Sequence, residues 1–248
     1  MLIRKIQAKS ILSKSKVMDY VVNPYIGCSH SCAYCYARFM KRVTGHKEPW
    51  GTFVDVKINA PQILPRDIGK NRRGEVWLSS VCDPYQPLEK KYKLTRKCLE
   101  VLLLYDWPVT IQTKSVLVLR DLDLLKKLKK VGVGFTISTD DDKIRKIFEP
   151  GASTIQQRID ALKRLHSAGV STYAFIGPIL PMNATNLVKQ LAGKVDHVLV
   201  DRMNYHYADE VYKKNNLEYA MTDEFFAQKK KELAATLKEH RISAEFLF

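Results

Sequence analysis

Strand-like and helix-like stretches alternate along most of the chain, and this alternation limits the fold more than any other feature. Residues typical of β-structure predict strands at 53–58, 75–81, 108–113, 133–138, 171–177, 195–200 and 244–248. Apolar residues at helical spacing predict helices at 94–105, 121–130, 153–168, 183–193 and 223–240. Strands separated by helices of this length form βαβ units, so we predict an α/β fold with a parallel sheet. We expect a single domain over residues 1–248, with its core at about 17–205 and a helical and strand extension at about 206–248.

Functional groups of such folds gather where the parallel strands end. In barrels of this kind, the active site lies on the loops that follow the C-terminal ends of the strands. The predicted strands therefore single out five segments, which are Ser80–Pro84, Lys114–Ser115, Ser138–Asp140, Pro178–Asn183 and Asp201–Asn204.

Cysteine usage points to metal binding. The chain has five cysteines, an odd number, and three of them fall within eight residues. This pattern is unlike a secreted disulfide framework and favours a metal site in a reducing compartment. The N-terminus lacks the apolar core of a signal peptide, and the longest apolar runs are too short to cross a bilayer. We expect a soluble, cytoplasmic protein without a membrane partner.

The charge of the chain allows two interpretations. Lys and Arg total 41 and Asp and Glu total 26, which gives a formal net charge of +15. Such an excess favours a polyanionic partner, of which nucleic acid is the usual one. Many of the cations are lysines on predicted helix faces, however, and solvated lysine faces give the same excess without any partner. Charge alone leaves both interpretations open.

The segment Asn23–Arg38, NPYIGCSHSCAYCYAR, carries the three clustered cysteines with the spacing C-x3-C-x2-C. Thiolates are the usual ligands of a [4Fe–4S] cluster, and three of them leave one iron open for a ligand from outside the protein. The alternative is a zinc site with His30 or Cys82 as its fourth ligand, although zinc sites usually show two ligand pairs. A zinc or iron–sulfur protein without catalytic activity would have the same thiols.

Five segments occur in an order that resembles a known family. They are NPYIGCSHSCAYCYAR, SSVCDPYQPLE, TKSVLVLRDLDLL, EPGAS with QQR, and GPILPMN, and together they span about residues 20–205. They are similar to the radical S-adenosylmethionine superfamily, and within it to the spore photoproduct lyase-like branch, also called DNA repair photolyase-like. The resemblance implies a partial (β/α)6-type parallel barrel.

The resemblance also implies the cofactors and the reaction. A [4Fe–4S] cluster would be held by Cys28, Cys32 and Cys35, and S-adenosylmethionine would bind its open iron. An electron donor of the flavodoxin or ferredoxin type would reduce the cluster. Cleavage of S-adenosylmethionine would then give a 5′-deoxyadenosyl radical that takes a hydrogen atom from the substrate. Tyr34 would touch the adenine of the cofactor.

Four further residues match cofactor-binding positions by the same resemblance. Lys114 would neutralise the carboxylate of S-adenosylmethionine, and Asp83 would receive its ammonium or ribose hydroxyl groups. Ser138 would bind the ribose or the amino acid moiety, and Arg158 would contact the cofactor. Each has a structural alternative: a surface lysine, a turn residue, a helix cap, and an ion pair between Arg158 and Glu149.

Two residues are candidates for a catalytic role. The hydrogen-donating cysteine of the lyase branch falls at Ser80, so the sequence departs at this position from the pattern for spore lesion repair. Cys82 is a nearby thiol, and Tyr205 lies in an aromatic and basic stretch, so both are candidates. Cys98, on an apolar helix face, is predicted to be a core residue. The substrate is therefore open between nucleic acid, as in lesion repair or modification, and a protein or small molecule.

Overall fold

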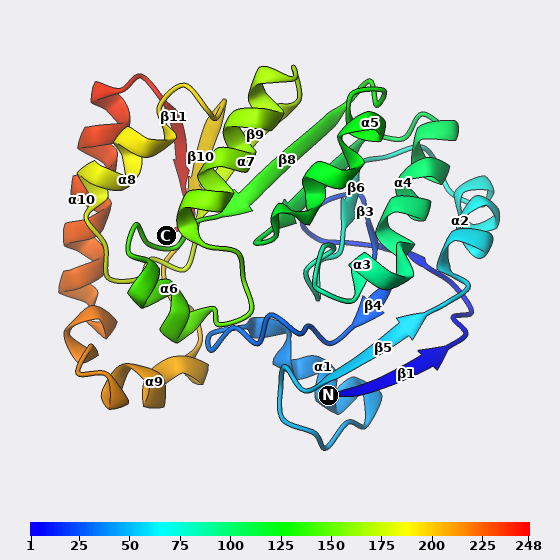
Figure 1. Ribbon diagram of the computed structural model, residues 1–248, viewed down its shortest axis with the longest axis horizontal. Helices are drawn as coiled ribbons and strands as arrows, with labels where there is room; N and C mark the ends of the chain where they lie inside the picture. Colours follow the sequence, from blue (N-terminus) through cyan, green and yellow to red (C-terminus); the bar gives the residue numbers. More distant parts are fainter. The chain divides into compact units, whose positions relative to one another are not determined.

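The computed structural model describes all 248 residues, and the chain forms two compact units (Figure 1). Unit 1 contains Met1–Ser31 and Ala37–Val133, and unit 2 contains Cys32–Tyr36 and Gly134–Phe248. The chain thus passes between the units within the cysteine segment, and again within strand β8 (Val131–Thr136). The expectation of a single domain over the whole chain stays a prediction.

Unit 1 holds a small sheet and a larger one. In the small sheet, β1 (Leu2–Ile6) runs parallel to β5 (Phe53–Lys57), and β4 (Tyr25–Ile26) runs antiparallel to β5. The larger sheet has the order β2, β3, β6, β7, with bounds Leu12–Lys14, Tyr20–Val22, Val76–Leu78 and Val109–Thr113. Strands β3, β6 and β7 are parallel, and β2 pairs with β3 in the antiparallel sense.

Short helices follow the strands of unit 1. They are α1 (Met40–Thr44), α2 (Ala60–Gly69), α3 (Glu89–Tyr92), α4 (Leu94–Leu104) and α5 (Leu122–Leu125), with 3-10 turns η1 (Tyr36–Phe39) and η2 (Val116–Asp121). Helices α2 and α4 pack against each other (Figure 1). The buried face of α4 includes Cys98, which is fully enclosed, so its predicted place in the core is confirmed.

Unit 2 continues the parallel arrangement. Strands β9 (Ser171–Ile176), β10 (His197–Val200) and β11 (Ser243–Phe246) pair in parallel, and the Ile137 N–H, just after β8, donates to the Phe175 carbonyl. The helices are α6 (Asp142–Phe148), α7 (Ile155–Ser167), α8 (Ala184–Leu191), α9 (Asp209–Lys214) and α10 (Asp223–Glu239), with 3-10 turns η3 (His206–Ala208) and η4 (Glu218–Met221). Helix α7 packs on β9, and α8 on α10.

The α/β class and the parallel pairing predicted from the sequence are confirmed, but individual elements differ. The predicted strand at 53–58 forms as β5, yet it belongs to the small sheet. Helix α2 was not predicted, because it contains Pro61 and Pro65. Proline is tolerated best in the first turn of a helix, so a second proline argues against helix formation. Of the helix predicted at 121–130, only the four residues of α5 are α-helical, and they directly follow the 3-10 turn η2. None of the helices has the length and apolar character that crossing a bilayer requires.

Candidate functional site

The cysteine segment is a series of tight turns with mostly buried thiols. Cys28 and Cys32 are each 6% exposed and Cys35 is half-buried, and none of the five cysteines forms a disulfide. The Ser31 N–H donates to the Cys28 carbonyl, and the Cys35 N–H donates to the Cys32 carbonyl, both at 3.3 Å. The backbone therefore turns after each of these two cysteines, and the hydrogen bonds of the two turns hold the backbone that carries their side chains.

Gly27 makes the first turn possible. Its φ of +82° lies in the left-handed region that favours glycine, and a Cβ atom there would lie 2.4 Å from the Phe53 carbonyl oxygen. Phe53 is itself held by the buried His46 ring, stacked at a centroid distance of 3.9 Å. The ring nitrogens of His46 contact Glu48 at 2.8 Å and Asp55 at 3.0 Å. This polar set, which sequence reasoning missed, fixes the surface against which the loop turns.

Gln86 fastens the chain on both sides of Cys28. Its side-chain oxygen accepts a hydrogen bond from the Ser29 N–H at 3.1 Å, and its side-chain nitrogen donates to the Gly27 carbonyl at 3.1 Å. Gln86 is fully buried, so water does not compete for these bonds. Sequence reasoning also missed this residue, because a single glutamine in a proline-containing loop carries no spacing signal.

Asp83 joins the loop after β6 to the end of β7. Its carboxylate accepts hydrogen bonds from the Tyr85 N–H at 2.8 Å, the Thr113 hydroxyl at 2.7 Å and the Lys114 N–H at 2.7 Å. Burial raises the pKa of this carboxyl, but the His30 ring at 3.4 Å and the hydrogen bonds from Thr113 and Lys114 lower it to about 2. Asp83 is thus a fixed anion with three donors from the chain, and its contact with a cofactor stays a prediction.

His30, one of the two residues considered as a fourth zinc ligand, is 2% exposed and faces Asp83 at 3.4 Å. Lys114, whose backbone also meets Asp83, is partly exposed, and its predicted contact with S-adenosylmethionine is untested by this geometry.

The Cys82 thiol lies in an apolar environment. It packs against the cluster of Tyr25, Val54, Val56, Leu88 and Leu94, and its sulfur donates to the Tyr25 carbonyl at 3.4 Å. Burial raises its pKa to about 12, so it keeps its S–H bond at neutral pH. Its predicted catalytic role stays a prediction.

A buried charged network holds the second half of the cysteine segment. The Tyr34 hydroxyl donates to Glu149 in a short hydrogen bond, and Glu149 pairs with Arg158 at 2.5 Å. Arg158 also donates to the carbonyl of Thr136, at the end of β8, at 2.8 Å. Burial and the Glu149 charge raise the pKa of Tyr34 well above its usual value. The predicted alternative for Arg158, an ion pair with Glu149, is confirmed, and contact with a cofactor stays a prediction.

Ser138 is fully buried beside this network. Its hydroxyl donates to the Gly177 carbonyl at 3.2 Å and lies 3.5 Å from the Tyr34 hydroxyl. The alternative role as a helix cap is wrong, because the side chain of Asp141 accepts the N–H of Lys143 at the start of α6. A role of Ser138 in cofactor binding stays a prediction.

Tyr205 belongs to a row of exposed rings in unit 2. It stacks on Tyr36 at a centroid distance of 6.3 Å and on Tyr207 at 5.9 Å, with interplanar angles of 22° and 12°. The three residues are 39%, 49% and 40% exposed in the order Tyr36, Tyr205, Tyr207. Tyr36 directly follows Cys35, so the row begins at the cysteine segment, and flat aromatic ligands can stack on such rings.

The donor set fits an iron–sulfur cluster better than zinc. Three thiols are present without disulfides, and thiolates are the ligands that iron–sulfur clusters prefer. The two residues considered as a fourth zinc ligand have other contacts, since His30 faces Asp83 and Cys82 faces the Tyr25 carbonyl. The residue types of the cysteine segment therefore suit an iron–sulfur cluster, and the role of Cys28, Cys32 and Cys35 as its ligands stays a prediction.

Comparisons with known proteins agree with this interpretation. The sequence model described as the radical SAM superfamily, where SAM is S-adenosylmethionine, matches residues 22–188. An uncharacterized protein of Methanocaldococcus jannaschii is 43% identical over 179 residues, which are 71% of this chain and 67% of that protein. An uncharacterized protein of Mycobacterium tuberculosis is 30% identical over 185 residues, which are 71% of this chain and 54% of that protein. The chain thus spans between half and two thirds of the length of these relatives.

The fold is also similar to solved structures. A mutant of spore photoproduct lyase with bound S-adenosylmethionine and dinucleoside spore photoproduct superimposes with a TM-score of 0.69 at 16% identity, over 100% of this chain and 82% of that one. This likeness confirms the expected partial parallel barrel. Because the family match covers well over half of the residues and includes the entire cysteine segment, the chain belongs to the radical SAM superfamily of iron–sulfur enzymes.

Proposed function

We propose that Cys28, Cys32 and Cys35 hold a [4Fe–4S] cluster to which S-adenosylmethionine binds, and that the protein modifies a nucleic acid substrate through a radical. The observation that carries this proposal is the family match across the cysteine segment, together with the absence of disulfides among its thiols. When bound and reduced, the cluster and S-adenosylmethionine supply a 5′-deoxyadenosyl radical that takes hydrogen from substrate.

The residues of the chain would position these groups and exclude water. Gln86 fixes the backbone on both sides of Cys28, and the Tyr34–Glu149–Arg158 network fixes the backbone between Cys32 and Cys35. Lys114 would offer its ammonium to the cofactor carboxylate. Asp83 would orient Lys114 by accepting its backbone N–H, whether or not the carboxylate touches the cofactor.

Two features support nucleic acid as the substrate class. The net charge of +15 favours a polyanion. The row Tyr36–Tyr205–Tyr207 offers exposed ring faces that begin beside Cys35, and nucleobases stack on such faces. The solved structure of similar fold named above contains a dinucleoside spore photoproduct.

The radical chemistry can be tested by anaerobic reconstitution. We expect the reduced protein, supplied with iron, sulfide and S-adenosylmethionine, to form 5′-deoxyadenosine, measured by mass spectrometry. Dithionite can replace the flavodoxin- or ferredoxin-type donor. The variant Cys32→Ala should form none, whereas Cys98→Ala, which removes a buried thiol far along the chain from the motif, should retain the product if it folds. Zinc at one atom per chain in place of iron would refute the proposal.

The substrate class needs a separate experiment. Binding to short single- and double-stranded DNA and RNA should weaken steeply as salt rises, because phosphate contacts release counterions. Formation of 5′-deoxyadenosine together with affinity for peptides but not for nucleic acids would support a radical enzyme acting on protein instead.

A further inference from the structure

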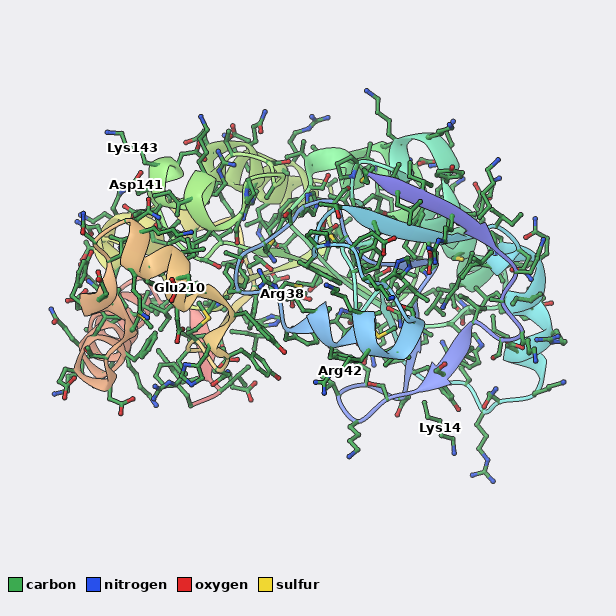
Figure 2. All side chains as sticks on the ribbon, turned by 90° about the horizontal axis from the view of Figure 1, so that it is seen from below. Lys14, Arg38, Arg42, Asp141, Lys143 and Glu210 are labelled. Carbon is green, nitrogen blue, oxygen red and sulfur yellow. The ribbon has the colours of Figure 1, made fainter.

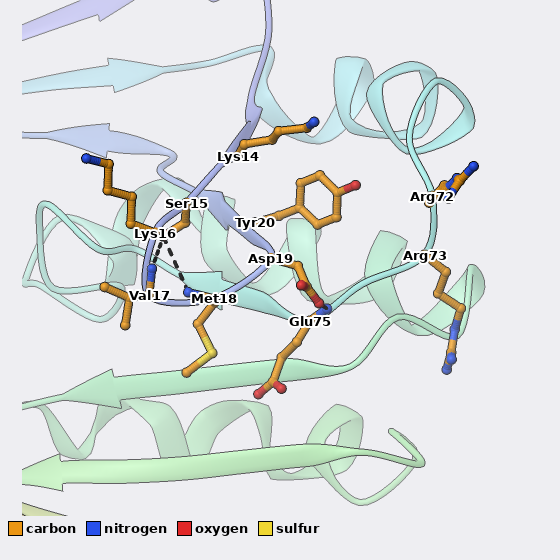
Figure 3. Close-up of a pocket in the computed structure, with 10 residues that line it drawn as sticks. All are labelled: Lys14, Ser15, Lys16, Val17, Met18, Asp19, Tyr20, Arg72, Arg73 and Glu75. Carbon is orange, nitrogen blue, oxygen red and sulfur yellow. Dashed lines mark hydrogen bonds between the residues drawn. The ribbon is translucent and has the colours of Figure 1, made fainter.

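A groove in unit 1 lies on elements that the cysteine site does not use. It has a volume of about 670 Å³ and is open to solvent, and it is formed by the turn between β2 and β3 and by residues of the link between α2 and β6 (Figure 3). The turn contributes residues 14–20, and the link contributes Arg72, Arg73 and Glu75. An open groove of this kind suits an extended ligand better than a small enclosed one.

Three cations of the groove have no acidic partner. Lys14, Lys16 and Arg72 are exposed, and none of them forms an ion pair or a side-chain hydrogen bond within the chain. Figure 3 shows the Lys14 side chain above the Tyr20 ring and the Arg72 side chain to the right of it, and Figure 2 shows Lys14 pointing away from the ribbon. Arg73 differs, because it is tied to Asp106 through a 2.7 Å bond to the carbonyl and a 3.4 Å contact to the carboxylate.

The acidic residues of the groove are engaged in holding its walls together. Asp19 accepts the Glu75 N–H at 2.8 Å, which joins the turn to the link, and Glu75 accepts a hydrogen bond from the Thr110 hydroxyl. Gly74 permits this close approach, since a Cβ atom there would lie 2.8 Å from the Asp19 Cβ. Four basic side chains against two carboxylates leave the groove with an excess of two positive charges, and three of the four cations are exposed without an acidic partner.

We propose that this groove is a second nucleic-acid contact, at which Lys14, Lys16 and Arg72 bind the phosphodiester backbone without reading its sequence. This inference rests on the proposed nucleic acid substrate and adds a binding site for it. Lysines act as point charges toward phosphates, and contacts to the backbone position a nucleic acid without specifying bases. Cations contributed by two segments of the chain suit a polymer whose phosphates repeat along its length.

The test compares two variants of the full chain that lose the same charge. One is K14A/K16A/R72A, which removes the three unpartnered cations of the groove. The matched control is K126A/K127A/K130A, which removes three exposed lysines of the same unit that lie outside the groove and form no ion pair. Binding of a fluorescent 20-base-pair DNA duplex and of the corresponding single strand is measured by anisotropy across a series of salt concentrations.

We expect the groove variant to lose about tenfold or more in affinity at low salt. The slope of log affinity against log salt concentration should become shallower by the equivalent of roughly two to three phosphate contacts, since each neutralised phosphate contributes about 0.9 to that slope. The control should change affinity less than about threefold. Formation of 5′-deoxyadenosine without substrate should be unchanged in both variants, because neither alters a residue of the cysteine site. Unchanged product also shows that the groove variant is folded.

The outcomes separate this inference from the proposed function. Equal loss in both variants would overturn the groove, because it would mean that affinity follows total charge, while nucleic acid would remain the substrate class. Absence of binding by the unaltered protein at every salt concentration would overturn both the nucleic acid substrate and the groove. Binding of an acidic protein, with no binding of DNA, would likewise overturn both.

Discussion

The two halves of the cysteine segment are held in chemically opposite ways. Around Cys28, in unit 1, the backbone is fixed by a neutral amide, that of the buried Gln86. Between Cys32 and Cys35, in unit 2, it is fixed through a tyrosine that leads to a buried ion pair, Glu149–Arg158. An unpaired amide costs little compared with an unpaired buried charge. The second half of the segment should therefore be more sensitive to the loss of a single partner, and the first half more tolerant.

The largest effect is expected at Arg158. The substitution Arg158→Met leaves the Glu149 carboxylate buried without a cation, so the free energy of unfolding should fall by about 3–5 kcal/mol. Chemical denaturation of the reduced apoprotein measures it. The double variant Arg158→Met with Glu149→Gln should recover much of the loss, since it removes the stranded charge. If the double variant is no more stable than the single one, the ion pair is not what holds this half.

The two halves should also differ in their response to pH. The folded pKa of Asp83 is lowered to about 2, so its stabilising contribution is complete above its unfolded pKa, near 4, and is lost as the pH falls toward 2. At about 1.36 kcal/mol per unit, that contribution is roughly 2 kcal/mol. The folded pKa of Tyr34 is raised, so its contribution is complete below the unfolded pKa, near 10, and is lost as the pH rises beyond it.

Unfolding measured from pH 2 to 11 tests this difference. Asp83→Asn should flatten the acid side of the profile and leave the alkaline side unchanged, and Tyr34→Phe should do the reverse. A profile in which both substitutions change the same side would contradict the assignment of one titrating group to each half.

A smaller effect is expected at Gln86. Gln86→Ala leaves the Ser29 N–H and the Gly27 carbonyl without their partner, which should cost about 1–3 kcal/mol. We also expect the variant to retain less iron per chain after reconstitution and desalting, because the loop that carries Cys28 loses its anchor. Gln62→Ala, at an exposed position of the same unit, is the matched control. Full iron retention in Gln86→Ala would show that the amide serves folding only.

The contacts on which this comparison rests could be predicted from the sequence to different degrees. Local spacing was enough for the three cysteines, and Arg158 lies only nine positions after Glu149, so their pairing could be proposed. The bond from Tyr34 to Glu149 spans 115 positions, and that from Ser29 to Gln86 spans 57, and no periodicity connects such positions. The contact of His30 with Asp83 could not be predicted for the same reason, because Asp83 follows a distant strand.

Elements were easier to predict than their partners. Alternating apolar patterns give α7 and β9 within one or two residues, because each element buries one face of its own. Strand β5 was also found, but its membership in the small sheet depends on β1 and β4, whose charged or very short sequences carry no strand pattern. Sequence patterns thus predict which residues are buried, whereas the residues that they contact depend on the three-dimensional fold.

The smallest effect on folding is expected at Tyr205, where an effect on DNA binding can be distinguished from an effect on stability. Because its ring is 49% exposed, Tyr205→Ala should change the free energy of unfolding by less than about 0.5 kcal/mol. If the row of rings receives a base, the same substitution should weaken binding of single-stranded DNA by about 1–3 kcal/mol, and Tyr205→Phe, which keeps the ring, should not. Tyr219→Ala, at an exposed tyrosine of the same unit outside the row, is the control. Equal affinity of all three variants would remove Tyr205 from the binding surface. A loss of stability as large as that of Gln86→Ala would instead mean that the row of rings also stabilises the cysteine segment. The comparison between the neutral amide around Cys28 and the charged network between Cys32 and Cys35 would then leave out a third stabilising contact.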